Sequence, residues 1–405
     1  MAATVTRPEI DLLSPAFYGD LDGMHEAFTW MRANEPLFRC ERSGMWGVTR
    51  HADVLDVEHR SEVFSSAGSY RSIQNPDEDN MIAQDDPGHL DQRRLVSRRF
   101  TPKAVKDLES VMTRMIDDLV SAFTAGVAPG GSGRMEAVTA LAAALPAQLT
   151  AHLLGFPEEI WPQIKSWSER LMRYDSVPHD NAVANEFLAA IGEFVAVLQD
   201  TAAARREHPS DDLVSVWVHG AEQGCPMGDS KLVNETGLFI SGGAETTRTV
   251  IARSLIAFAD HPDQWEAMHE DRSLLPGAVE EMIRWVTPLN NMFRVATADS
   301  EVGGRPVKAG DRFALLYPSA NRDEAVFEDP FTFDIHRNPN PQIAFGFGTH
   351  FCLGASLARL EIKAMFQELL EKVDRFERPA DGTVVDIPNS FVYGVKHADI
   401  TVVPN

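Results

Sequence analysis

Hydrophobic residues recur every three to four positions through most of the chain, and this spacing is typical of amphipathic helices. The pattern is mainly helical from about residue 85 to about residue 295. The clearest helices are predicted at 105–122, 141–154, 186–206, 211–219, 232–259 and 276–285, with others at 25–34 and 353–373.

Apolar and polar residues alternate in shorter stretches, which we predict to be strands. Residues 36–40 and 45–49 alternate on either side of a short turn, so this part of the chain should form a hairpin. The stretches 297–316 and 384–403 also have the composition of strands. Strands are therefore expected near both ends of the chain.

Two polar stretches predict loops: residues 65–88, and the sequence Ala-Pro-Gly-Gly-Ser-Gly-Arg at 128–134. No strand–helix–strand repeat occurs, which argues against a dinucleotide-binding sheet. We predict a fold that is mainly α with small β-sheets. It should form a single domain over residues 1–405, with a β-rich part at about 1–70 and a helical part at about 85–295.

Composition narrows the functional classes. The net charge of −23 makes binding to nucleic acid through the overall field unfavourable. No secretory pattern opens the chain and no run of about 18 apolar residues occurs, so we expect no membrane insertion. The three cysteines, Cys40, Cys225 and Cys352, are too few for a disulfide framework and favour the cytoplasm. We expect a monomer, with Cys40 and Cys225 as small buried hydrophobic residues.

Cys352 has unusual neighbours. It lies in a loop, residues 345–354, that leads into a helix predicted to open at Leu353. A thiolate at a helix N-terminus is stabilised by free backbone N–H groups and by the helix dipole. Three glycines permit turns with positive φ or close approach to a planar ring: Gly346, Gly348 and Gly354. The alternative is a glycine-rich turn that holds a buried thiol.

The spacing Phe-x-x-Gly-x-x-x-Cys-x-Gly, met by Phe345, Gly348, Cys352 and Gly354, resembles the haem-binding loop of the cytochrome P450 family. This resemblance implies the cytochrome P450 fold, a triangular helical domain. Haem b would lie between the long helix at 232–259 and the helix after the cysteine loop. It also implies that Cys352 is the iron ligand of a haem-thiolate monooxygenase that uses O₂.

Further segments strengthen the resemblance. Glu281 and Arg284 share one helix face and match the Glu-x-x-Arg pair of the family, in which an arginine matching Arg337 completes a buried network. Alone, the pair would be an ordinary surface ion pair. Four cationic residues match the ligands of the haem propionates, and for each the alternative is a solvated surface role: His89, Arg93, Arg294 and His350.

Gly242 and Gly243 lie inside the long predicted helix, where each costs roughly 1 kcal/mol relative to alanine. One explanation is a packing notch against another helix. The other is a kinked, locally widened helix that leaves room for O₂ and water. The family has an acid–alcohol pair here, matched by Glu245 and Thr246. The resemblance implies that Thr246 hydrogen-bonds at the oxygen site and that Glu245 relays protons.

The substrate pocket is expected to be apolar and free of charge, so the substrate should be apolar too. The expected lining, each member of which could instead be plain core, is Met81, Ile82, Met172, Phe239, Ile240, Gly243, Ala244, Leu289, Met292, Phe391 and Val392. Several stretches resemble actinobacterial enzymes that oxidise the terminal methyl of a steroid side chain or methyl-branched lipid: 17–18, 30–34, 274–285 and 337–340. Residues 69–80 match those enzymes less closely, and a terpenoid or other apolar metabolite is the alternative.

Residues 93–103 are strongly basic within an acidic chain. In the family this segment borders the cysteine side of the haem, so we expect it to attract an acidic ferredoxin, itself reduced by an NAD(P)H-dependent ferredoxin reductase. A solvated helix face is the alternative. A peroxide-using peroxygenase or a non-catalytic haem sensor are the other functional classes considered, and the pair Glu245–Thr246 argues against both.

Overall fold

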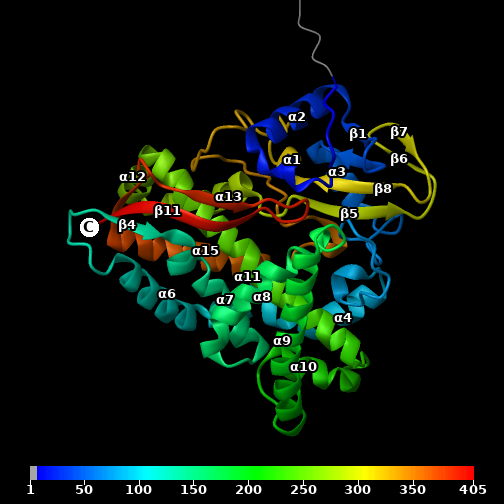
Figure 1. The fold of residues 1–405 in the computed structure, drawn as a ribbon, viewed down its shortest axis with the longest axis horizontal. Helices are drawn as coiled ribbons and strands as arrows, with labels where there is room; N and C mark the ends of the chain where they lie inside the picture. The colour runs from blue at the N-terminus through cyan, green and yellow to red at the C-terminus, as the bar shows by residue number, and fades with distance from the viewer. Residues whose placement is uncertain (1–6) are drawn as a thin grey trace, which may run out of the picture.

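The computed structural model describes residues 7–405, and Figure 1 shows their triangular outline. The helices are α1 (Pro15–Gly19), α2 (Leu21–Asn34), α3 (His51–His59), α4 (Gly88–Ser97), α5 (Pro102–Asp107), α6 (Glu109–Thr124), α7 (Ala144–Leu154), α8 (Trp161–Leu171), α9 (Asn181–Glu207), α10 (Leu213–Val218), α11 (Asp229–Asp260), α12 (Pro262–Glu270), α13 (Leu275–Val286), α14 (Tyr317–Ala320) and α15 (Ala355–Lys372). The strands are β1 (Leu37–Cys40), β2 (Met45–Val48), β3 (Phe64–Ser65), β4 (Gly133–Glu136), β5 (Asn291–Ala296), β6 (Ser300–Val302), β7 (Arg305–Val307), β8 (Arg312–Leu316), β9 (Val373–Glu377), β10 (Val384–Ile387) and β11 (Gly394–Pro404).

The largest sheet has the order β1-β2-β8-β5-β3 and lies with α1, α2 and α3 in one corner of the molecule (Figure 1). Its first two strands form the predicted hairpin, antiparallel with Leu37 opposite Val48. β2 then pairs in parallel with β8, and β8 pairs antiparallel with β5. The sheet therefore joins the N-terminal hairpin to a strand pair from late in the chain.

The tail forms the second sheet, in which β11 pairs with β10, β4 and β9. Here the prediction of a flexible loop at 128–134 is partly wrong, because Gly133 and Arg134 begin β4 and face Val402 and Thr401 of β11. Pairing with a strand far away in the sequence overrides the local preference of glycine for turns. A separate ribbon is formed by β6 and β7.

The predicted helices are present, although several boundaries differ, as at α9, which begins at Asn181 rather than 186. The helix expected at 105–122 is divided at Leu108 into α5 and α6. A π-helical turn over Val138–Ala142 precedes α7. The last long helix begins at Ala355 rather than Leu353.

The 32-residue helix α11 crosses the middle of the molecule and contacts α7, α8, α13 and β11. Near its C-terminus, Phe258 lies edge-on to Trp265 and Phe333. Edge-to-face contacts between aromatic rings have a preferred geometry, so they help to orient α11 relative to α12. Cys40 and Cys225 are both buried, as expected. α15 packs against α6 and α13, and this arrangement presents the loop before α15 to α11.

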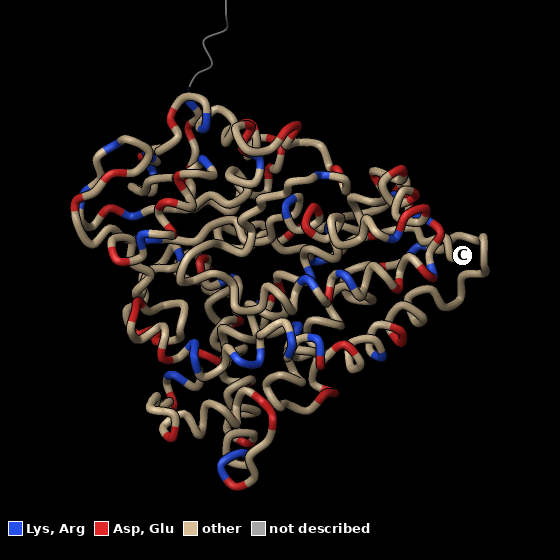
Figure 2. The backbone as a smooth tube through the Cα atoms, turned by 180° about the vertical axis from the view of Figure 1, so that it is seen from behind, with Lys and Arg blue, Asp and Glu red and all other residues tan. Residues whose placement is uncertain are grey.

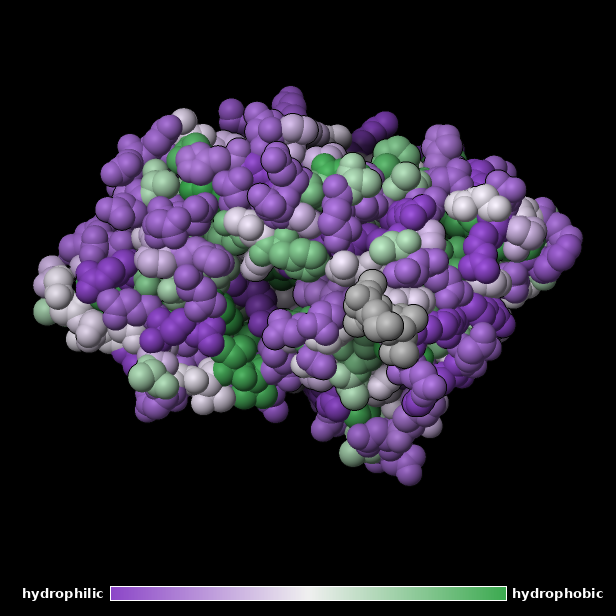
Figure 3. All heavy atoms as spheres, turned by 90° about the horizontal axis from the view of Figure 1, so that it is seen from above, coloured by the Kyte–Doolittle hydropathy of each residue, from purple (hydrophilic) through white to green (hydrophobic). Residues whose placement is uncertain are grey.

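The surface is mixed. Acidic and basic residues are interspersed over the whole chain (Figure 2). Seen from above, the molecule is mostly hydrophilic, with hydrophobic residues beside a hollow near the centre (Figure 3). Within residues 7–405, α9 alone is long and apolar enough to cross a membrane, and the sequence analysis did not identify it as such. In the fold α9 packs along α8 and α10.

Candidate active site

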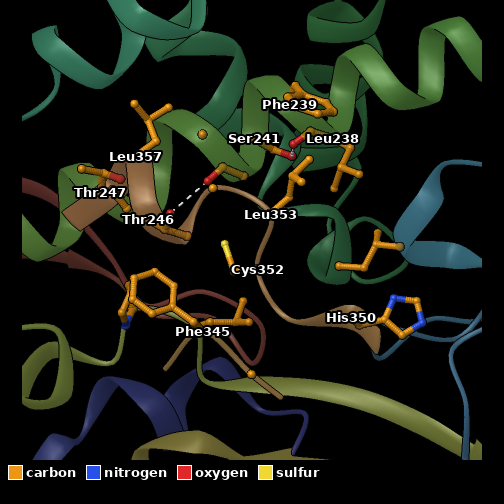
Figure 4. A pocket seen from close by; sticks show the side chains of 18 of the residues that line it. Leu238, Phe239, Ser241, Thr246, Thr247, Phe345, His350, Cys352, Leu353 and Leu357 are labelled. Atoms are coloured by element: carbon orange, nitrogen blue, oxygen red, sulfur yellow. Dashed lines mark hydrogen bonds between the residues drawn. The ribbon is translucent and has the colours of Figure 1, made fainter. Parts of the chain in front are cut away.

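A large cavity lies between α11 and the cysteine loop, residues 345–354 (Figure 4). Gly242, Gly243 and Thr246 line it from α11, and Cys352 lines it from the opposite side. The sulfur of Cys352 points into the open space that faces the helix. The sequence-predicted thiol and alcohol therefore share one cavity.

The cysteine loop is held by its own backbone and by α3. The Cys352 N–H donates to the Phe345 carbonyl at 3.0 Å. Gly348 has φ +69°, and a side chain there would meet the Glu58 carbonyl oxygen at 2.5 Å, so only glycine fits. Gly346 also has φ +69°.

Gly354 differs from the expectation, because its φ is −84° and a side chain would come no closer than 4.0 Å to the Cys352 sulfur. Its backbone N–H instead hydrogen-bonds that sulfur. Burial raises the pKa of the Cys352 thiol, while the Gly354 N–H, Arg93 and Arg359 act in the opposite direction. The loop thus already carries groups that favour a thiolate.

All four predicted propionate ligands line the cavity: His89, Arg93, Arg294 and His350. The two imidazole rings lie 4.3 Å apart between centroids. Both Nε2 atoms are buried and lack a hydrogen-bond partner among residues 7–405. Burial lowers the pKa of His350 to about 2, with Arg294, His89 and Arg93 adding to the shift. Two arginines beside two imidazoles with unpaired ring nitrogens form a buried group that is suited to receiving carboxylates.

Glu58 on α3 also lines the cavity, and it is not among the residues predicted for the site. It accepts a hydrogen bond from the Tyr317 hydroxyl at 2.5 Å, and its Oε1 lies 3.6 Å from Nη2 of Arg294. Burial raises the pKa of Glu58 to about 7. The sequence does contain a signal for Glu58, because it lies four residues after Val54 and therefore on the same, buried face of α3.

The two glycines of α11 have different surroundings. A side chain on Gly243 would meet Oγ1 of Thr150 at 3.0 Å, whereas a side chain on Gly242 would meet nothing within 4 Å. Gly243 is thus the packing notch, and Gly242 leaves space on the cavity side. The α-helix is continuous through both, so the expected local widening is absent from the structure.

Thr246 and Glu245 face different ways, because successive helix residues are about 100° apart. The Thr246 hydroxyl donates to the Gly242 carbonyl at 2.9 Å and lies at the cavity. Glu245 does not line the cavity and is ion-paired with Arg248. Burial raises the pKa of Glu245, although Arg248 opposes the shift.

The Glu281 carboxylate binds both predicted arginines. Arg284 donates to both of its oxygens at 2.7 Å, and Arg337 donates to Oε2 at 3.2 Å. Arg284 also donates to the carbonyls of Asn321 and Pro330, so the network ties α13 to the loop before the cysteine. Glu281 and Arg284 have no exposed side-chain surface.

The expected pocket residues divide into two groups. Those that line the cavity are Met81, Ile82, Met172, Phe239, Gly243, Leu289, Met292 and Phe391. Ile240, Ala244 and Val392 do not. Ile240 and Ala244 are one turn apart on the face of α11 that packs into the core, and Val392 follows Phe391 in extended chain, where neighbouring side chains point to opposite sides. The pocket is also not free of charge, because Arg71 lines it.

These residues fit haem. In residues 7–405 no three His, Cys, Asp or Glu side chains are grouped to hold a metal, so iron at Cys352 would need its other ligands from a macrocycle. Cys352 would supply the thiolate ligand, and the unpaired nitrogens of His89 and His350 lie at the cavity, where propionates would satisfy them.

Comparison with known proteins agrees with this geometry. A family model for cytochrome P450 matches residues 148–401. A steroid C26-monooxygenase of Mycolicibacterium smegmatis is 39% identical over 100% of this chain and 99% of its own length. A methyl-branched lipid omega-hydroxylase of Mycobacterium bovis is 34% identical over 89% of this chain and 84% of its own length.

A solved structure confirms the predicted fold. The Mycobacterium marinum cytochrome P450 in complex with pseudoionone superposes with a TM-score of 0.88 at 29% identity, over 98% of this chain and 100% of that chain. The chain therefore belongs to the cytochrome P450 family, and its activity is that of a cytochrome P450 monooxygenase.

Proposed function

We propose that this enzyme oxidises the terminal methyl of a steroid side chain or of a methyl-branched lipid. The observation that carries the proposal is a largely apolar cavity lined both by Cys352 and by the Thr246 hydroxyl. A steroid C26-monooxygenase and a methyl-branched lipid omega-hydroxylase are among the relatives, which supports this substrate class.

When bound, haem supplies the iron at which O₂ is reduced and one oxygen atom is inserted into a C–H bond. Cys352 would hold the iron, and His89, Arg93, Arg294 and His350 would hold the propionates. The apolar lining would exclude water from the reacting carbon and orient the substrate by shape.

Thr246 and Glu245 would divide the handling of protons. The Thr246 hydroxyl donates a hydrogen bond to the Gly242 carbonyl, so its oxygen is free to accept a hydrogen bond at the cavity. Glu245 is joined through Arg248 to Glu169, which pairs with the partly exposed Lys165 at 3.0 Å. Arg248 holds Glu245 in place but cannot relay a proton, because a guanidinium has no lone pair to accept one. The Glu245 carboxyl, whose pKa is raised by burial, would hold the proton for the oxygen site.

Two ligands test the substrate class: cholest-4-en-3-one and a methyl-branched fatty acid, each titrated into the haem-loaded ferric protein while the Soret band is recorded. We expect a saturable shift from low to high spin, and terminal oxidation when electrons are supplied. A protein that shifts with neither ligand but with a terpenoid would overturn the substrate class.

Thr246→Ala tests the mechanism. We expect reductant consumption to continue while product falls about 10-fold or more and peroxide rises, because proton delivery is no longer directed. Thr246→Ser keeps the hydroxyl and should restore coupling. Full coupling in the alanine variant would refute the proposed role, and peroxide-driven turnover without ferredoxin would favour a peroxygenase.

We also propose a ferredoxin and its NAD(P)H-dependent reductase as electron donors, and the cytoplasm as the location. Arg94, Arg98 and Lys103 are exposed on the segment that leads from α4 into α5. Arg93 of this segment donates to the Phe351 carbonyl, one residue from Cys352. A positive face so close to the cysteine loop supports docking of an acidic donor there.

A further inference from the structure

Arg71 is a buried cation in the wall of the substrate cavity. It lies in the irregular segment between β3 and α4, and only 7% of its surface is exposed. It lines the large cavity together with Tyr70, Leu238 and Ser241, and the same four residues line a second, smaller cavity. Cys352 lines only the large one, so Arg71 lies where the two cavities meet and the thiol lies away from that junction.

Aromatic rings hold the guanidinium in place. Its central carbon lies 4.6 Å from the ring centroid of Phe391, 5.3 Å from that of Tyr70 and 5.4 Å from that of Tyr174. Nε donates to the Tyr70 hydroxyl at 2.9 Å. The planar group is therefore fixed before any ligand arrives.

The hydrogen-bonding capacity of Arg71 is not used up. Its Nη1 is buried and has no hydrogen-bond partner within residues 7–405. The nearby acids bind other groups in part: Glu78 accepts from the Tyr70 hydroxyl at 2.6 Å, and Oδ1 of Asp175 accepts from the Ser72 N–H at 3.1 Å. Oδ2 of Asp175 is buried and has no hydrogen-bond partner among residues 7–405.

A buried N–H without an acceptor costs about 1–3 kcal/mol, more when the group is charged. An acceptor brought by the substrate would remove this cost. A carboxylate matches the two-pronged geometry of a guanidinium better than a single carbonyl oxygen does. Glu78 and Asp175 keep the charge of Arg71 favourable while the site awaits its ligand.

We infer that Arg71 binds the carboxylate of an apolar acid, whose other end extends along the cavity towards Cys352. The inference rests on the proposed function and narrows it to substrates with an acid at the end away from the oxidised carbon. The apolar lining residues, among them Met81, Ile82 and Met172, would contact the chain between the two ends.

The test compares a methyl-branched fatty acid with its methyl ester by isothermal titration calorimetry on the haem-loaded protein. We expect the wild type to prefer the acid, and Arg71→Gln to weaken binding of the acid about 10- to 100-fold while changing the ester less than about 2-fold. Arg71→Lys keeps the positive charge but lacks the two parallel N–H donors of a guanidinium. Its affinity for the acid should lie between those of the wild type and Arg71→Gln. Equal losses for acid and ester, or an unchanged acid, would overturn the inference.

Two controls separate the inference from folding and from the proposed function. Arg312→Gln is the matched variant, because Arg312 bonds the carbonyl of Ser72, beside Arg71, but lines neither cavity. It should keep the preference for the acid, and an unchanged Soret band of the ferrous carbon monoxide complex shows an intact haem site. Product analysis is an independent measurement. Oxidation away from the terminal methyl would refute the proposed function, while the calorimetry would still show whether Arg71 binds the carboxylate.

Discussion

Glu235 is a buried carboxyl on α11 that accepts the backbone N–H of Met81 at 2.8 Å. Burial raises its pKa to about 8, although the Met81 N–H acts in the opposite direction. A carboxyl whose pKa is higher in the folded state than in the unfolded chain binds its proton more tightly when folded. Its contribution to stability is complete below about pH 4.5 and is lost as the pH rises towards 8.

Glu235→Gln should therefore flatten the dependence of stability on pH. The neutral amide keeps an oxygen for the Met81 N–H but has no proton to lose. Each unit of pKa shift corresponds to about 1.4 kcal/mol, so the variant should gain a few kcal/mol over the wild type between pH 5 and pH 8. Urea unfolding at both pH values measures this. Glu266→Gln, on the exposed side of α12, should leave the dependence unchanged; parallel curves for wild type and Glu235→Gln would contradict the prediction.

At the scale of the element, the adjacent glycines of α11 should respond differently to alanine. Gly242→Ala meets no atom within 4 Å and should stabilise the helix by up to about 1 kcal/mol, while reducing space in the cavity. Gly243→Ala would be 3.0 Å from Thr150, whose hydroxyl is held by the Pro146 carbonyl, so it should gain less or lose stability. Thermal unfolding measures the stability of both variants. A second substitution, Thr150→Ala, should restore stability to Gly243→Ala and should not change that of Gly242→Ala. Equal effects of the two single variants would disprove the packing notch.

The Glu281 network is the second test at this scale. Glu281→Gln leaves Arg284 and Arg337 without their shared carboxylate in a fully buried place, so unfolding should cost about 3–5 kcal/mol less. The neighbouring Glu280 binds Arg359 in a partly exposed pair, and Glu280→Gln should cost less than about 1 kcal/mol. Denaturant titration measures both, and similar losses would show that burial does not decide the effect.

The sequence predicts those features that depend on residues close together along the chain. The hairpin, α11 and the cysteine loop are encoded by local spacing, so their prediction needed no tertiary information. β4 was missed because its pairing depends on β11, at the other end of the chain. Arg71 was missed because an irregular segment has no periodicity that reveals which side chains turn inward. That the chain forms one domain stays a prediction.

At the scale of the whole molecule, acidic and basic residues are interspersed, and the segment from α4 into α5 carries several exposed cations. Arg94 and Arg98 are exposed on the segment whose Arg93 donates to the Phe351 carbonyl, and 40% of the Phe351 surface is exposed. An aromatic side chain beside cations is typical of interface centres, where charge guides the approach and apolar contact holds the partner. Arg94 and Arg98 do not line the cavity that Arg71 lines, so a change at either of them should affect electron supply without affecting substrate binding.

Arg98→Glu should separate electron supply from substrate binding. We expect the KM for an acidic ferredoxin to rise several-fold and its dependence on ionic strength to weaken, because a guiding positive charge has become negative. Titration of the ferric protein with substrate should be unchanged, since Arg98 does not line the cavity. Arg42→Glu makes the same change of charge at an exposed position near the N-terminal hairpin and should leave the KM for ferredoxin unaltered. If both variants raise that KM equally, the overall charge of the protein, and not this face, guides the electron donor.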